Sequence, residues 1–313
     1  SPRVAATRRT APPRGGGLVF RTLRRRVHVN RSTLAATALV LTSALAALPL
    51  ALAEGRTPPV GRGAAMPPIK IKIVSESGIA GDLSEAQACA MPGWKVIGGG
   101  AEVHADVAGG LLTASYPEGN CWRAQSKAHQ VSDEQRVVAY AILLYDPKNE
   151  WDVAVEQATG ETAAHPMAQV RVRDGYAMTC GGARVNWTGA GNLLTASFPA
   201  TDTVWEARSK DHGASDPATI TAYAIGIRAR NGQAPKTFVQ TSVSSVKPHP
   251  AKGETLPEEW TLSGGGARTN WHGAGNLLWA SYPSDERSWR AAGKDNVDPS
   301  PASVSVFVIG IKP

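Results

Sequence analysis

The chain repeats one pattern three times, and this repetition constrains the fold more than any other feature of the sequence. A glycine-rich segment recurs at offsets of 82 and 84 residues, as Gly93–Ala101, Gly175–Ala183 and Glu259–Ala267. The same further features follow each copy in the same order: a segment ending in an aromatic-Pro pair (Leu111–Pro117, Leu193–Pro199, Leu277–Pro283), a tryptophan (Trp122, Trp205, Trp289), a lysine (Lys127, Lys210, Lys294) and a closing apolar segment (Val137–Ile142, Ile220–Ile225, Val304–Ile309). Self-similarity of this kind marks a repeat architecture, so we predict three modules of about 84 residues.

The repeated segments have the apolar patterns of β-strands. Each module opens with an alternating segment, at Ile69–Ile73, Asp152–Val155 and Thr237–Val239, and we expect a loop of about 20 residues after it. The closing segments are apolar on both faces, which is typical of a central strand. No stretch has helical periodicity. The prediction is an all-β fold of three tandem antiparallel β-sandwich modules in pseudo-threefold arrangement.

The predicted module boundaries are 69–148, 149–234 and 235–313, with residues 54–68 as a flexible arm rich in Pro and Gly. Gly189–Asn192 and Gly273–Asn276 have turn chemistry, so we predict that each joins two strands of a hairpin. The Gly-Gly-Gly run at Gly98–Gly100 could cradle a phosphate or form a bulge. No helix pattern follows it, which favours the bulge.

The formal net charge of +7 lies in the first 53 residues, which hold nine arginines and no acidic residue. The rest of the chain has 24 basic and 26 acidic side chains, so we expect no nucleic-acid partner. Residues 1–53 comprise upstream residues and a signal peptide, with a basic segment at 21–31, an apolar segment at 34–50 and a cleavage site after Ala53. The sequence therefore predicts a secreted protein without stable membrane insertion after cleavage. The alternative is an uncleaved signal anchor. The richness of the first residues in Ala, Arg, Gly and Pro fits a bacterial source.

Three cysteines leave at least one thiol unpaired within the chain. The possible disulfide joins Cys89 and Cys121, because both lie in one module. The histidines have no metal-ligand spacing, and we predict no metal and no cofactor. Ser115, Ser197 and Ser281 stand before aromatic-Pro pairs without a nucleophile elbow, and Ser-Lys-x-His in two modules becomes Gly293-Lys294-Asp295-Asn296 in the third. We therefore predict no catalytic residues and a protein that is not an enzyme.

The modules resemble a known β-module family. The motifs that carry the resemblance are Gly-Trp-x-x-x-Gly-Gly at Gly93–Gly99, a strand ending at Ser115–Pro117, the Trp122 strand and the closing Val137–Ile142. They are similar to the Cys-rich units found threefold in the C-terminal domain of the convertase that regulates LDL-receptor levels, singly in resistin, and in the β-rich tail of apicomplexan perforin-like proteins. The resemblance implies a recognition domain rather than an enzyme. The family has several disulfides in each unit, whereas this chain has one candidate.

Trp187 and Trp271, preceded by Asn186 and Asn270, are the candidate ligand-binding residues. They stand beside glycines at a predicted turn, and module 1 has His104-Ala105 at that place. An aromatic ring that is not required in every copy is a candidate contact residue. The alternative is that each ring folds back over its own hairpin.

Two functions remain open. The first is a secreted non-catalytic recognition module that binds a carbohydrate or cell-surface target. The second is an adaptor or structural subunit of an extracellular protein assembly, with the N-terminal arm, Glu54–Val74, pairing with a partner. In either case the expected partner is an extracellular glycan or protein.

Overall fold

The computed structural model describes residues 65–313, so the predicted leader and most of the predicted arm lie outside the described residues. The described part is all-β and holds 18 strands and no helix, and thus no helix that could cross a membrane. Module 1 contains β1 (Ile71–Ser77), β2 (Leu83–Cys89), β3 (Trp94–His104), β4 (Gly110–Glu118), β5 (Cys121–Ala128) and β6 (Arg136–Tyr145). Module 2 contains β7 (Trp151–Thr159), β8 (Met167–Arg171), β9 (Ala177–Asn186), β10 (Leu193–Pro199), β11 (Val204–Lys210) and β12 (Thr219–Ala229). Module 3 contains β13 (Lys236–Val243), β14 (Ala251–Thr255), β15 (Thr261–Asn270), β16 (Leu277–Pro283), β17 (Ser288–Lys294) and β18 (Ser303–Lys312).

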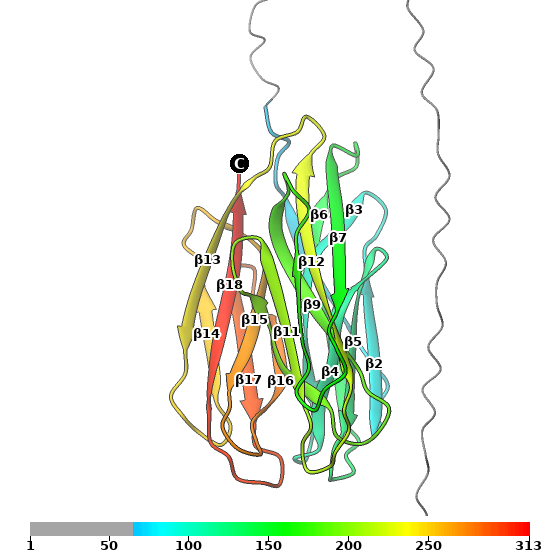
Figure 1. Cartoon of the computed structure of the whole chain (residues 1–313). Helices are drawn as coiled ribbons and strands as arrows, with labels where there is room; N and C mark the ends of the chain where they lie inside the picture. Colours follow the sequence, from blue (N-terminus) through cyan, green and yellow to red (C-terminus); the bar gives the residue numbers. More distant parts are fainter. Residues whose placement is uncertain (1–64) are drawn as a thin grey trace, which may run out of the picture. The chain divides into compact units, whose positions relative to one another are not determined.

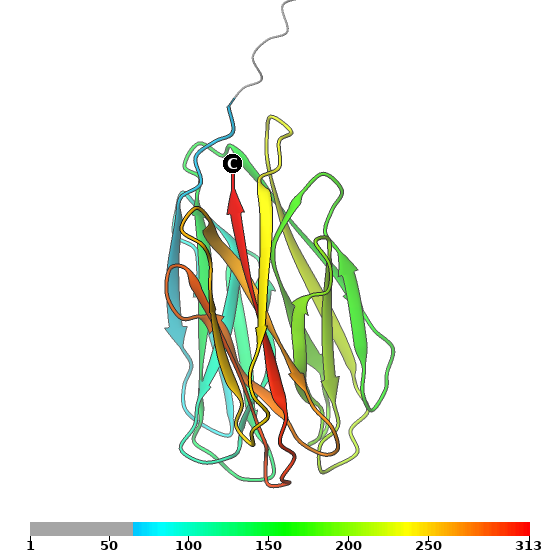
Figure 2. The same cartoon turned by 90° about the vertical axis from the view of Figure 1, so that its left-hand side faces the viewer.

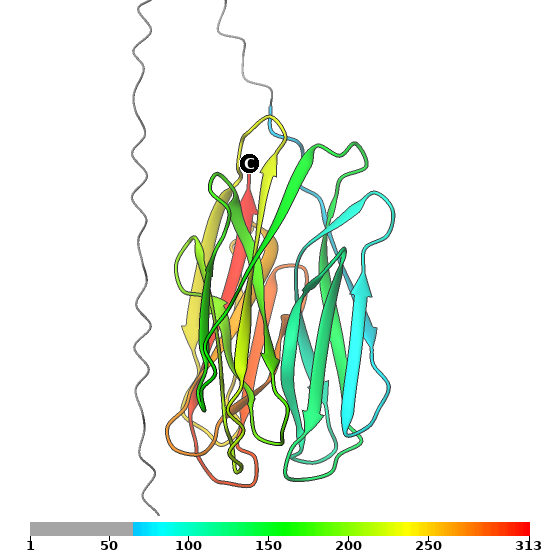
Figure 3. The ribbon, with the colours of Figure 1, turned by 45° about the vertical axis from the view of Figure 1, so that its right-hand side comes forward.

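Every sheet is shared between two modules. The three antiparallel six-stranded sheets have the orders β1-β6-β3-β16-β17-β14, β13-β18-β15-β10-β11-β8 and β2-β5-β4-β9-β12-β7. Each module thus gives three strands to one sheet and three to the next, and the exchange closes in a circle. Figure 1 shows β13, β18, β15 and β11 of the second sheet, and Figure 3 shows the cyan strands of module 1 beside the green strands of module 2. The pseudo-threefold arrangement therefore rests on strand pairing as well as on packing.

The predicted hairpin between the glycine-rich strand and the next strand is wrong. β9 and β10 lie in different sheets, and so do β3 and β4, and β15 and β16. The segments between them, 105–109, 187–192 and 271–276, are crossovers, which we call the arches. Turn residues and alternation identify two strands and the bend between them, but they do not identify the partner with which each strand pairs.

The first part of each module differs from the expected strand and long loop. The expected loop of about 20 residues contains a second strand in every module: β2, β8 or β14. The end of the predicted N-terminal arm, Ile71–Val74, belongs to β1, which pairs with β6 of its own module and is the edge strand of its sheet. β1 and the second strand of each module lie at a sheet edge, where the local sequence is a weak guide to strand pairing.

The closing strands β6, β12 and β18 are central, as predicted, because each has a hydrogen-bonded strand on both sides. Ile142, Ile225 and Ile309 are fully buried in a core that draws on all three modules. The strand register breaks between Val96 and Gly98 opposite β6, where the sequence indicated a bulge.

The repeated tryptophans and serines form one structural unit in each module. Trp122, Trp205 and Trp289 are at most 1% exposed, and each pairs in register with the proline at or next to the end of the preceding strand. The indole Nε1–H groups donate to Ser115, Ser197 and Ser281 at 2.9, 3.0 and 3.0 Å. The serines thus satisfy a buried donor, which is a structural reason for their repetition.

Cys180 occupies the pseudo-threefold axis, where β3, β9 and β15 meet. The Thr179 hydroxyl donates to the Ile97 carbonyl at 2.6 Å, and the Ser263 hydroxyl donates to the Thr179 carbonyl at 3.0 Å. Modules 1 and 3 have Gly98 and Gly264 where module 2 has Cys180. A Cβ on Gly264 would lie 2.7 Å from Cys180 Sγ, so the axis accommodates one side chain beyond glycine at this level.

Candidate functional site

The arches lie together at one end of the domain. Asn186 pairs with Thr219 and Asn270 with Ser303, which are the first residues of β12 and β18. Because β18 runs from this end to the C-terminus, the arches lie opposite Pro313, at the lower end of Figure 2. The site residues predicted from the sequence therefore come from equivalent positions at one end of the molecule.

Trp187 and Trp271 are half-buried, and each covers a lysine of the preceding module. Lys127 Nζ lies 3.9 Å from the ring centroid of Trp187, and Lys210 Nζ lies 3.9 Å from that of Trp271. The lysine therefore covers part of each ring, although small glycines and an alanine stand close to it in the chain. The covering residue comes from another module, some 60 residues earlier, so the local sequence did not reveal it.

The buried lysines also bind the backbone of the arches. Lys127 donates to the Gly189 carbonyl at 3.3 Å, while Lys210 donates to the carbonyls of Gly273, Ala274 and Gly275. Burial lowers the pKa of each lysine to about 8, and the Asp216 carboxylate partly opposes this for Lys127. We call each lysine with its tryptophan a latch, because the pair joins two modules at this end.

Asn186 and Asn270 connect the arches to the closing strands. Asn270 Nδ2 donates to the hydroxyls of Ser303 and Ser305 at 3.0 Å each, and its Oδ1 accepts from Arg268 Nε at 3.0 Å. Asn186 Nδ2 makes the corresponding bonds to two threonines of β12. The two asparagines thus have structural bonds within their own modules, and Asn270 also orients an arginine.

A groove of about 670 Å³ borders Trp271. Its lining includes His165, Met167, Arg208, Arg268, Asn270 and Trp271. The ring of His165 meets the indole edge-on, with centroids 5.4 Å apart. Arg208 and Arg268 are exposed. The groove therefore combines a fixed aromatic ring with several side chains that donate hydrogen bonds.

The equivalent groove at Trp187 is smaller and differs in chemistry. Its volume is about 170 Å³, and it is lined by Leu83, Glu85, Gln125 and Trp187 among others. Leu83 and Glu85 stand where the larger groove has His165 and Met167. At the third arch, module 1 has Ala105 at the position of the tryptophan. The three copies thus share a framework, but they differ in the side chains that they present.

Residue-by-residue comparison of the copies would have found the arginines that the sequence interpretation missed. Arg268 stands where the other modules have Glu102 and Arg184, and Arg208 stands where module 1 has Gln125. Residues repeated in all copies mark the framework, whereas differences between copies at equivalent positions, as at these arginines and at Trp271, mark the side chains that each copy presents.

The Lys-x-His segments of modules 1 and 2 lie against each other, and Asn296 of module 3 donates to the His129 carbonyl at 2.9 Å. His129 Nδ1 donates to the Ala190 carbonyl at 2.9 Å, so neutral His129 accepts at Nε2 from His212 Nδ1, 3.0 Å away. His212 Nε2 is then unprotonated and buried, has no hydrogen-bond partner among residues 65–313, and lies 3.9 Å from Asp298 Oδ2. Burial, with His129 and Lys210 nearby, lowers the pKa of His212 to about 4.

Among the described residues, no group of His, Cys, Asp or Glu side chains is arranged to hold a metal.

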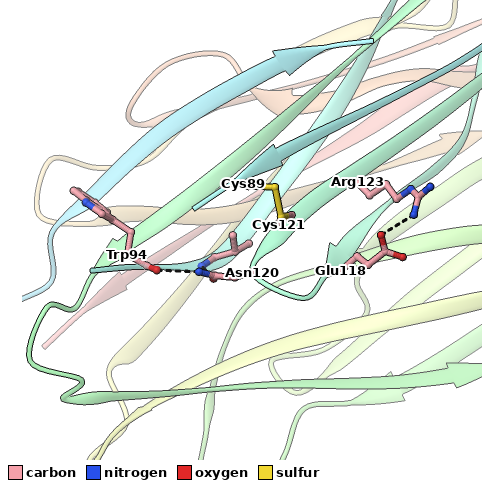
Figure 4. Close-up of a disulfide and its surroundings, with 7 residues drawn as sticks. Cys89, Trp94, Glu118, Asn120, Cys121 and Arg123 are labelled. Carbon is pink, nitrogen blue, oxygen red and sulfur yellow. Dashed lines mark hydrogen bonds and ion pairs between the residues drawn. A yellow bond between two sulfur atoms is a disulfide. The ribbon is translucent and has the colours of Figure 1, made fainter. Parts of the chain in front are cut away.

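Cys89 and Cys121 form a disulfide between neighbouring strands of module 1 (Figure 4). Next to it, Asn120 donates to the Trp94 carbonyl at 3.1 Å and accepts from the Val96 amide at 3.0 Å. The disulfide therefore lies at the end of the domain opposite the arches. It links the edge strand β2 to β5 and so stabilises β2. Cys180 is buried as a free thiol.

No protein-family model and no curated protein sequence matches this chain. We therefore infer function from the side chains that distinguish the two grooves. Trp271, Arg208 and Arg268 border the larger one and are the candidate contact residues.

Proposed function

We propose that this protein is a non-catalytic recognition module that binds a carbohydrate in the groove at Trp271. The observation that carries the proposal is a half-buried indole, fixed by Lys210, at the wall of an open groove of about 670 Å³. Arg208, Arg268 and His165 border the same groove. This arrangement offers an apolar ring face and convergent hydrogen-bond donors to one ligand.

A sugar suits this combination because it has both apolar C–H faces and many hydroxyl groups. An aromatic ring contacts the C–H face, and the amphipathic neighbours bind the hydroxyls. The latch with Lys210 holds Trp271 before a ligand arrives. A pre-ordered ring costs little conformational entropy on binding, which favours affinity.

The direct test compares Trp271→Ala with Trp187→Ala in binding titrations against an array of oligosaccharides. Both variants break one latch and leave one lysine uncovered, so we expect similar losses of stability. We expect only Trp271→Ala to lose binding, by more than about fivefold, because an aromatic anchor commonly contributes more than about 1 kcal/mol. If Trp271→Ala binds as the unaltered protein does, the groove is not the binding site.

We further propose that the chain is exported, as the arginine-rich and apolar segments within residues 1–53 indicate. The Cys89–Cys121 disulfide supports export, since disulfides persist in oxidising compartments. Intact-mass analysis of protein from culture supernatant should place the N-terminus within a few residues of Glu54. A cell-bound product that retains residues 34–53 would contradict the proposal.

The kinship with the threefold Cys-rich β-modules also remains a proposal. The threefold order of modules and the single disulfide of module 1 support it. Modules 2 and 3 have no disulfide, and their cores must supply the corresponding stability.

A further inference from the structure

Two arginines stand side by side on the outer face of the sheet next to Trp271. In the strand register, Ala196 of β10 pairs with Arg208 of β11 on one side and with Arg268 of β15 on the other. Residues directly opposite each other in antiparallel strands point to the same face. Arg208 and Arg268 therefore share a face, at two strand spacings or roughly 10 Å.

The positive charge of this pair is only partly balanced. Arg208 Nε donates to Glu206 Oε1 at 2.6 Å, and Glu206 also accepts from Gln169 at 2.6 Å. Arg268 Nε donates to Asn270, and its guanidinium lies 5.7 Å from the ring centroid of Phe198. Within residues 65–313, Arg268 has no carboxylate at ion-pair distance. Its terminal nitrogens are available to a ligand.

The equivalent rows of the other two sheets lack such a pair. Around Ala114, the partners are Gln125 and Arg184, with Glu85 next along the row. Around Ala280, the partners are Ala292 and Glu102. The three faces share one backbone arrangement. The face beside Trp271 is the one on which two arginines flank the central alanine.

We infer that the ligand of the Trp271 groove is an acidic oligosaccharide, whose carboxylate or sulfate groups are bound by Arg208 and Arg268 while Trp271 contacts a sugar ring. The inference rests on the proposed function. Guanidinium groups bind carboxylates and sulfates through paired, charge-assisted hydrogen bonds. A nucleic acid is disfavoured, because two arginines on a chain with more acidic than basic residues after position 53 neutralise few phosphates.

The test is titration calorimetry of the full chain with four probes. These are a galacturonic-acid hexamer, the same hexamer with its carboxylates reduced to alcohols, a heparin-derived hexasaccharide and a six-nucleotide oligo-dT. We expect at least one acidic hexamer to bind about tenfold more tightly than the reduced hexamer, with an affinity that falls as salt rises. Preference between the uronate and the sulfated probe identifies which anionic group is recognised.

Arg268→Gln and Arg184→Gln are the matched variants. Both arginines lie at equivalent positions over an aromatic ring, with guanidinium-to-centroid distances of 5.7 and 5.8 Å, so both variants should keep the thermal midpoint of the unaltered protein. Arg268→Gln should weaken binding of the acidic hexamer about tenfold, the loss expected for a hydrogen bond to a charged group, and Arg184→Gln should not.

The outcomes separate the inference from the proposed function. Equal binding of the acidic and reduced hexamers, lost in Trp271→Ala, would leave a carbohydrate-binding module and overturn the acidic ligand. Equal effects of the two arginine variants would overturn the assignment of the charged face. Tighter binding of oligo-dT would replace a glycan with a nucleic acid. If no hexamer binds but an oligosaccharide of the array does, only the inference fails. If nothing on the array binds either, both the proposed function and the inference fail.

Discussion

Gly181→Ala is the most direct test of how the modules are built. Gly181 occupies the second position of the repeated glycine run, after Cys180, and the indole of Trp205 lies against it. A Cβ at this position would lie within 2.5 Å of Cδ2 and Cγ of Trp205 and of the Tyr223 carbonyl oxygen. Ordinary carbon contacts are about 3.5–4.0 Å, so the neighbours must move by more than about 1 Å.

Displacing either Trp205 or the Tyr223 carbonyl costs free energy. Trp205 is fully buried and hydrogen-bonded to Ser197, and the Tyr223 carbonyl belongs to the central strand β12. Overpacking of this kind costs about 1–3 kcal/mol, and we expect the upper end because a backbone atom is one of the obstacles. For a domain of this size, about 3 kcal/mol corresponds to a fall in Tm of roughly 6–12 °C.

The assay is thermal unfolding followed by far-UV and tryptophan signals, to check that the transition is two-state. Gly99→Ala and Gly265→Ala should give similar losses, because Trp122 and Trp289 occupy the same place in their modules. Gly253→Ala is the control, since its Cβ would meet no atom closer than 3.8 Å. Its Tm should change by no more than about 2 °C.

A Gly181→Ala protein that melts within about 2 °C of the unaltered protein would refute the packing of tryptophan on glycine. Unequal effects at Gly99, Gly181 and Gly265 would instead show that the three copies are not structurally equivalent. Trp205→Phe combined with Gly181→Ala should cost less than the sum of the two single changes, because the smaller ring relieves the clash.

Three further predictions follow from other parts of the domain. Ile225→Asp should destabilise the protein by about 3–5 kcal/mol in a denaturant titration, because it places an unpaired charge in the core, and an unchanged midpoint would show that β12 is not central. Cys89→Ser should lower stability by about 3–4 kcal/mol, as expected for loss of a crosslink with a sequence separation of 32, while thiol titration should find Cys180 reactive only after unfolding. The folded-state pKa of His212 is about 4, below its usual 6.5, so the unfolded chain takes up the extra proton and stability should fall as pH drops from 6.5 to 4. His212→Asn, which copies Asn296 of module 3, should have a smaller fall in Tm over that range, and an equal fall would assign the acid sensitivity to other groups.

The sequence predicted the modules well because repeated copies confirm one another. The central closing strands and the break in register near Gly98 both follow from patterns that the copies share. Apolar periodicity reports which residues are buried, and this property is local.

The pairing between modules could not be predicted in that way. The exchange of β4 into a sheet with β9 depends on contacts between residues some 70 positions apart, such as Ala114 with Arg184. The latch of Lys210 with Trp271 is equally remote in sequence. The repeated lysine after each tryptophan strand signalled a shared role, but only the fold shows that it reaches the next module.

Because the three modules exchange strands in a circle, a chain of this kind cannot lose or gain one module without opening its sheets. A fragment of two modules would lose the partners of one β3-type strand and one β4-type strand, and so expose two open sheet edges. Open edges promote aggregation, so single copies can be neither deleted nor added without a new way to close the ring. Sequence divergence within a fixed set of three copies is then the available route to new surfaces, and the contrast between Ala105, Trp187 and Trp271 shows that route in use.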